Sequence, residues 1–98
     1  MTASPGAVPA ISAIGDIRWR DHARIHGRVR SLRVRPWGGG SPVLEATVVD
    51  GTGGITLAFL GRRRIPGLDL GTEVVAEGCV AESRERLTLY NPVYTLIR

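Results

Sequence analysis

The sequence contains no lysine and a single cysteine, and both scarcities exclude kinds of chemistry. Without lysine there is no Schiff-base amine and no P-loop phosphate ligand. The lone Cys79 cannot form an internal disulfide or a multi-cysteine zinc site. We expect no metal site from Cys79 with His22 and His26, because zinc needs more ligands than these residues supply. Cys79 stands in an apolar segment, so we expect it to be buried and inert.

Long apolar runs and a secretory leader are also missing. No apolar stretch approaches the roughly 18 residues of a membrane-spanning helix. The N-terminus has neither the basic segment nor the continuous apolar segment of a signal peptide. We therefore expect a cytoplasmic protein without membrane insertion. Its 98 residues suffice for one domain, since domains typically run to about 100–150 residues.

The positive charge consists entirely of arginine, with 13 basic residues against 9 acidic ones and a net charge of +4. Arginines dominate residues 17–35 and recur at Arg62 to Arg64, whereas residues 65–97 carry more acids than bases. A basic front and a mildly acidic back are typical of a domain that meets a polyanion on one face. The same composition fits codon usage in a GC-rich genome and an ordinary solvated surface, so charge alone leaves both interpretations open.

The N-terminal half of the sequence predicts a tail followed by a long strand. Residues 1–12 are small and uncharged, which predicts a flexible tail before a domain at 13–98. Residues 22–35 alternate apolar and polar side chains, as a half-buried strand does. After Val29 the alternation slips by one residue, which would turn every later side chain to the wrong face. We therefore predict a β-bulge near Arg30–Ser31.

Four further segments predict strands: 43–49, 55–60, 73–82 and 87–97, the last interrupted by Asn91 and Pro92. The residues between these segments favour turns. Residues 50–54 form a tight glycine-rich turn, and residues 61–72 form a connector with at most one helical turn. Tyr90 and Tyr94 are expected on one face of the last strand. A bulged first strand, a tight second hairpin and this connector predict an all-β fold with little or no helix. The arrangement is that of a five-stranded Greek-key OB-fold barrel.

Three motifs make the sequence resemble a known group of proteins. DGTG at 50–53, LGRRRIPG at 60–67 and NPVY at 91–94 are similar to motifs of small actinobacterial OB-fold nucleic-acid-binding domain proteins. More distantly, the sequence resembles the wedge OB domain of the branch-migrating helicase RecG, a link to DNA repair. The resemblance spans roughly residues 22–97. It implies an OB-fold and nucleic-acid binding, and it implies no catalytic residue and no cofactor.

An OB-fold binds its ligands on the outer face of strands two and three, between the loops after strands one and four. Ten residues are candidate nucleic-acid contacts on this basis: Arg28, Arg30, Arg33, Arg35, Trp37, Arg62, Arg63, Arg64, Arg84 and Arg86. Arginine forks bind phosphates bidentately, and Trp37 among its glycines can stack on a base. Three structural alternatives stay open. Trp37 can pack on the rim of the barrel, and the first-strand arginines can pair with Glu77 or Glu82. The side chains of Arg62–Arg64 can hold the connector to the barrel by hydrogen bonds to carbonyls.

We therefore expect a non-enzymatic module that binds single-stranded or structured DNA or RNA through arginine–phosphate contacts, with Trp37 as a stacking contact. No pair of carboxylates or other acid–base set stands out. The outward positions of 43–49 and 55–60 carry no aromatic residue, which favours weak, phosphate-led binding. The alternative is a protein-interaction adaptor or homo-oligomer that uses the apolar outer strip of these two strands.

Overall fold

The computed structural model describes residues 10–97, which form an all-β protein. Its strands are β1 (His22–Pro36), β2 (Pro42–Val49), β3 (Gly54–Leu60), β4 (Glu73–Ser83), β5 (Arg86–Tyr90) and β6 (Val93–Ile97). Within residues 10–97 the only helices are two single 3-10 turns, η1 (Ile14–Asp16) and η2 (Gly38–Gly40). The predictions of an all-β chain and of a connector without a regular helix are confirmed. No helix in this part of the chain has the length and apolarity needed to cross a membrane.

The predicted N-terminal tail lies largely outside the described residues, which begin at position 10. Its last residues are paired with β1. Ile11 forms a parallel bridge with Arg24, and the Ser12 amide donates to the Arg24 carbonyl at 2.8 Å. The segment before η1 is therefore held along β1 by backbone pairing with Arg24.

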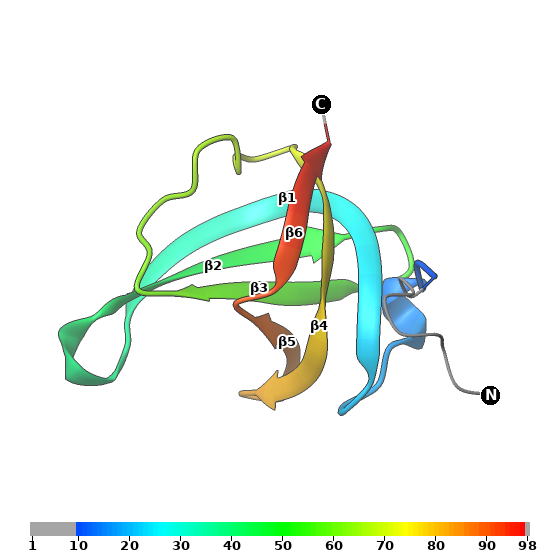
Figure 1. Cartoon of the computed structure of the whole chain (residues 1–98), viewed down its shortest axis with the longest axis horizontal. Helices are drawn as coiled ribbons and strands as arrows, with labels where there is room; N and C mark the ends of the chain where they lie inside the picture. The colour runs from blue at the N-terminus through cyan, green and yellow to red at the C-terminus, as the bar shows by residue number, and fades with distance from the viewer. Residues whose placement is uncertain (1–9, 98) are drawn as a thin grey trace.

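The strands close into a ring (Figure 1). Around it the order is β1-β2-β3-β5-β4, and β4 pairs back onto β1. Every pairing in the ring is antiparallel except that of β3 with β5, which is parallel. The predicted last strand is interrupted at Asn91 and Pro92, where Asn91 has a φ of 45°. As a result, β5 pairs with residues 80–83 of β4, whereas β6 pairs with residues 73–77.

The bend of β1 allows one strand to reach two partners. The first half of β1 pairs with β4 and the second half with β2. Between Val29 and Ser31 the register with β2 shifts, and Arg30 is the extra residue. The predicted bulge is confirmed. Beyond it Leu32 lies opposite Ala46 and packs against the core, so the inner side of the strand stays apolar.

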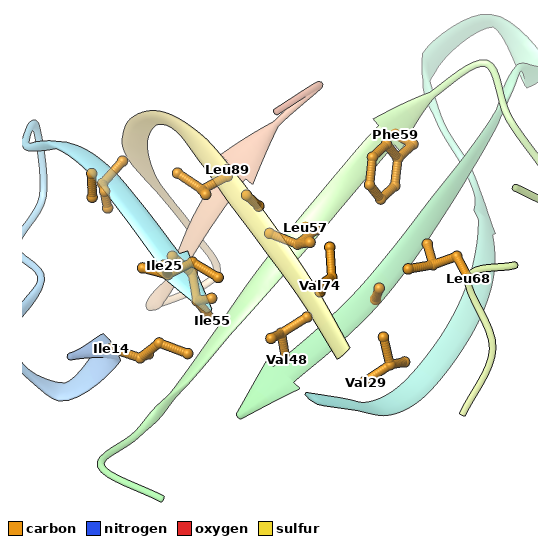
Figure 2. Packing of buried hydrophobic residues seen from close by; sticks show 14 of the residues in the cluster. Ile14, Ile25, Val29, Val48, Ile55, Leu57, Phe59, Leu68, Val74 and Leu89 are labelled. Carbon is orange, nitrogen blue, oxygen red and sulfur yellow. The ribbon is translucent and has the colours of Figure 1, made fainter. Parts of the chain in front are cut away.

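The core fills the ring with inward side chains from its strands (Figure 2). Fully buried members are Ile25, Val48, Ile55, Leu57, Val74 and Leu89. Segments outside the strands complete the cluster, with Ile14 and Ile17 from the N-terminal segment and Ile65 and Leu68 from the connector. Ile14 and Leu68 lie toward different ends of the cluster in Figure 2. Four apolar side chains from outside the strands therefore complete the core.

The carboxylate of Asp50 ties η1 to the β2–β3 turn. It accepts hydrogen bonds from the amide of Ile14 at 2.8 Å, the amide of Thr52 at 2.8 Å and the Thr52 hydroxyl at 2.6 Å. The Ile14 bond and then the Thr52 hydroxyl lower the pKa of Asp50 to about 2. The donors of this glycine-rich turn are thus directed at a side chain of the protein itself.

The packing around Gly27 predicts that alanine will not fit there. A Cβ at Gly27 would lie 2.5 Å from Val48 Cγ1 and 2.7 Å from the Val49 carbonyl oxygen. We expect Gly27→Ala to cost about 1–3 kcal/mol of unfolding free energy, measured by urea denaturation, because backbone must move. Gly38→Ala is the control, since a Cβ there meets nothing within 4 Å. Equal losses in the two variants would contradict this account.

Because of Asp50, the stability of the fold should decrease at acid pH. Its folded pKa of about 2 lies below the ordinary 3.8, so its contribution is complete above 3.8 and is lost as the pH falls through about 2. We expect Asp50→Asn to lower stability at neutral pH by about 1 kcal/mol, because the turn is exposed. Thermal unfolding down to pH about 2 tests the linkage. The variant should lose stability less steeply with acid than the parent or an Asp69→Asn control, and identical acid profiles would refute the role.

Candidate functional site

Four of the ten candidate residues line one shallow cavity on the outside of the ring. They come from the end of β1, from the β4–β5 turn and from the first position of β5: Arg33, Arg35, Arg84 and Arg86. The cavity has a volume of about 180 Å³, and its other lining residues are Glu45, Thr56, Ser83 and Thr88. We call these four arginines the arginine cluster. It overlies outward positions of β2, β3 and β5.

Two local features of the backbone bring the cluster together. After the bulge, Arg33 and Arg35 lie opposite Glu45 and Val43 and point out of the ring. On the other side, β4 and β5 are joined by a turn of two residues, Arg84 and Glu85, whose φ values are 53° and 64°. Positive φ at both central positions is typical of a type I′ hairpin turn, although arginine is uncommon there. The tight turn keeps Arg84 close to Arg86.

The cluster has a strong excess of positive charge. Among its lining residues, four arginines face one acid, Glu45, which leaves three positive charges uncompensated. Arg35 Nε lies 3.7 Å from Glu45 Oε1, and both side chains are half-buried. Glu85 lies in the same turn but lines a neighbouring depression. The hydroxyls of Thr56 and Ser83 add uncharged donors, whereas that of Thr88 donates to the Arg86 carbonyl. The site is therefore suited to an anion with several oxygen atoms.

Trp37 lies at the edge of this outer face and packs against Tyr90. Their ring centroids are 6.0 Å apart at an interplanar angle of 63°, an edge-to-face contact. Trp37 is nevertheless 42% exposed, so it is a partial lid that leaves ring surface accessible. The prediction that both tyrosines share a face is wrong. Tyr94 packs inward on Phe59 at 5.3 Å, because the Asn91–Pro92 break turns the chain between them.

The outer strip of β2 and β3 is buried in part. Val43 and Ala58 point outward, yet both are buried, whereas Val49 and Leu60 are partly exposed. Trp37 follows β1 and Tyr90 belongs to β5, so their contact spans the two strands between them. The apolar strip on which the adaptor alternative depends is therefore less exposed than the sequence predicts.

The other candidate arginines lie elsewhere. Arg28 donates to the Gly71 carbonyl at 3.0 Å and lies 3.8 Å from Glu73. Arg30 is the exposed bulge residue. Within residues 10–97, the first-strand arginines form ion pairs with Glu73 and Glu45 rather than with Glu77 or Glu82. The bend of β1 thus separates its arginines into two groups.

The arginines of the connector do not line the cavity of the cluster, but two of them lie beside it. Arg62, Arg63 and Arg64 are all exposed. Arg63 and Arg64 line a second depression that Arg33 of the cluster also lines, and Arg63 lines a small one with Arg35. Arg63 therefore adjoins two residues of the cluster. The connector is pinned by its own backbone, since the Gly71 amide donates to the Val29 carbonyl and the Val29 amide to the Thr72 carbonyl.

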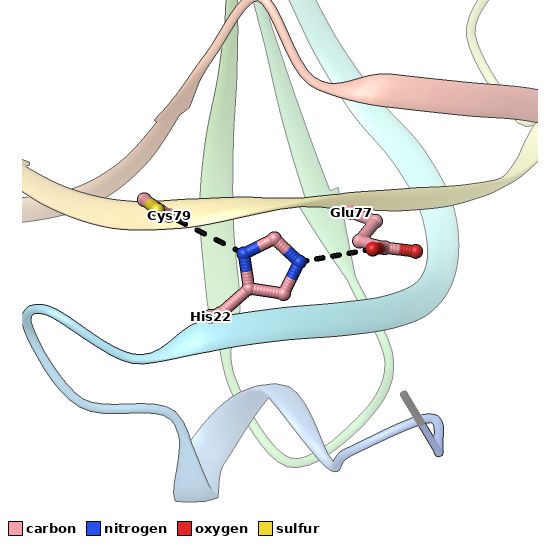
Figure 3. Close-up of polar contacts among 3 residues, drawn as sticks. All are labelled: His22, Glu77 and Cys79. Atoms are coloured by element: carbon pink, nitrogen blue, oxygen red, sulfur yellow. Dashed lines mark hydrogen bonds and ion pairs between the residues drawn. The ribbon is translucent and has the colours of Figure 1, made fainter. Parts of the chain in front are cut away.

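A second polar group involves residues that the sequence pattern did not connect (Figure 3). His22 Nε2 lies 2.9 Å from Glu77 Oε2, and His22 Nδ1 lies 3.8 Å from Cys79 Sγ. The prediction that Cys79 is buried is wrong, because β4 turns Val80 inward and the adjacent Cys79 outward, where it is exposed. The sulfur and the carboxylate face different nitrogens of one imidazole and so do not converge on a metal. Among the described residues no group of three His, Cys, Asp or Glu side chains is arranged so that it could hold a metal ion.

This group predicts the titration of His22. Hydrogen bonding to Cys79 and then to Glu77 raises the pKa of His22 above its ordinary 6.5. We expect Glu77→Gln to lower that pKa, measured from histidine ring signals in an NMR titration, because the variant removes a charged acceptor. The stabilisation is present below pH 6.5 and is lost as the pH rises through the raised value. An unchanged His22 midpoint in Glu77→Gln would show that the contact does not persist in solution.

No protein-family model matches the sequence, and no curated protein matches it. The function of the arginine cluster therefore has to be inferred from its own chemistry, which is an excess of guanidinium groups beside an accessible tryptophan.

Proposed function

We propose that the protein is a non-catalytic OB-fold module that binds single-stranded nucleic acid on the outer face of β2, β3 and β5. The strand order supports this assignment. A ring in which β1 closes on β4 and β3 runs parallel to β5 matches the five-stranded OB arrangement. The split of the last strand into β5 and β6 is compatible with it, because both pair along the same strand, β4.

The observation that carries the proposal is the convergence of four arginines on one cavity. Guanidinium groups match phosphate oxygens bidentately and remain charged at all relevant pH values. The cluster lies between the loop after β1 and the turn after β4, where OB-folds engage oligonucleotides. A phosphodiester backbone that crosses this face would compensate the three excess charges.

Trp37 supports single strands over duplexes as ligands. A tryptophan face stacks only on bases that are not already stacked and paired. Its edge contact with Tyr90 holds the ring in place while 42% of the residue remains exposed. Since the face offers one accessible aromatic ring beside the cluster, the binding energy should come mainly from phosphates, and affinity should fall steeply with salt.

The arginine cluster can be tested by charge-matched variants. We expect Arg33→Gln/Arg84→Gln to weaken binding of a labelled single-stranded oligonucleotide by about 10-fold or more at low salt, and to reduce the salt slope by about one per lost phosphate contact. Arg24→Gln/Arg28→Gln removes the same charge on the other half of β1 and should change affinity much less. Fluorescence anisotropy at two salt concentrations measures the affinity of both variants for single-stranded DNA, for RNA and for duplex DNA. No binding at low salt, or equal losses in the two variants, would refute the site.

Trp37 can be followed directly. In a Trp19→Phe background the emission of Trp37 should be quenched by single-stranded oligonucleotide, and quenching should saturate with the anisotropy signal. Trp37→Leu should weaken binding by roughly 1–3 kcal/mol if a base stacks there. Unchanged emission at saturation would leave phosphate contacts as the whole interface and remove the stacking part of the proposal.

A further inference from the structure

The outer edge of β6 is an unpaired sheet edge. In residues 10–97, β6 is the one strand with a single neighbour, since it pairs only with β4. No other backbone hydrogen bond within this range uses residues 93–97. Figure 1 shows β6 in red alongside β4, near the C-terminal end of the chain. Its remaining backbone donors and acceptors therefore have no backbone partner among the described residues.

This edge lacks the devices that usually prevent strand addition. Exposed edges are normally protected by charged side chains, proline or a bulge. Residues 93–97 read VYTLI and contain none of these. Tyr94 and Leu96 pack toward the core, whereas Val93 is 77% exposed and Ile97 40% exposed. An apolar, regular edge of this kind is a template for another strand.

We propose that β6 pairs with β6 of a second copy of this chain, antiparallel and about a two-fold axis at Thr95. An antiparallel pairing centred there is self-complementary. It places Val93 opposite Ile97 of the second copy, Tyr94 opposite its Leu96, and Thr95 opposite itself. Both exposed apolar residues of the edge are thereby buried against each other, which is what an isologous interface requires.

The charges on the neighbouring strands are compatible with a second copy as the occupant. Across β1, β4 and β6 the outward residues form two rows, Arg24–Glu77–Val93 and Arg28–Glu73–Ile97. Each row carries one positive charge and one negative charge and ends on an apolar residue. The proposed register joins the first row of one copy to the second row of the other. The two glutamates of the joined row then lie three strand spacings apart, about 14 Å, where salt screens them.

The expected dimer is weak. Five residues on each side bury less than the roughly 1,200 Å² of a typical specific interface. The inference depends on β6 alone and is independent of the proposed nucleic-acid binding, because no residue of β6 lines the arginine cluster. A dimer formed in this way would carry two arginine clusters.

Sedimentation equilibrium tests the interface. The unaltered chain should shift from monomer to dimer as its concentration rises toward about 1 mM, the Kd of a weak contact. Val93→Lys should remain monomeric, because at each end of the interface a lysine would face the apolar Ile97 of the other copy. Leu70→Lys is the matched control: Leu70 is 66% exposed but lies in the connector, and its variant should dimerise like the parent. A monomeric parent, or a Val93→Lys protein that still dimerises, would overturn the proposal.

Cross-linking tests the register without relying on a disruptive variant. In a Cys79→Ser background, Thr95→Cys places two thiols opposite each other, with Cβ atoms about 4.5–5.5 Å apart. Diamide, which accepts the two electrons and two protons released by a thiol pair, should then give a disulfide-linked dimer. Leu70→Cys in the same background should not cross-link to a comparable extent. Equal cross-linking at both positions, or none at Thr95→Cys, would contradict the proposed axis.

Discussion

The ring closes because β1 bends at Arg30 and can therefore pair with β4 before the bulge and with β2 after it. A straight strand of this length would leave one of those partners with an open edge. The extra residue also restores the inward phase, so that Leu32 returns to the core side after Val29. Closure, core packing and the direction of every later side chain of β1 thus depend on one inserted residue.

The same bend determines which arginines lie close together on the outer surface. Before the bulge, Arg28 is held by Glu73 and the Gly71 carbonyl. After it, Arg33 and Arg35 face the β4–β5 turn, where Arg84 and Arg86 add to the same field. Only Glu45 opposes them within that cavity. Like charges brought together at a protein surface cost free energy unless a counter-ion or ligand compensates them, which is why this arrangement points to an anionic partner.

Much of the fold could be predicted from the sequence, because it follows from local alternation. Strand bounds, the bulge at Arg30 and the break at Asn91–Pro92 are each marked by a change of phase, a glycine or a proline. The outward position of Cys79 could not be predicted in this way, since apolar neighbours surround it in sequence while only its parity within β4 turns it outward. The different directions of the two tyrosines escaped prediction for a similar reason, because the break restarts the alternation.

The sequence by itself determined the all-β character, the positions of the strands and the supply of arginines, because alternation and turn residues act over short range. Only the tertiary structure decided which arginines meet. Arg33 and Arg84 are far apart in the chain and are brought together by strand pairings whose register depends on long-range packing. The same holds for the contact of His22 with Cys79 and for the unpaired edge of β6, since an edge is defined by the neighbour that is missing and no local pattern encodes it.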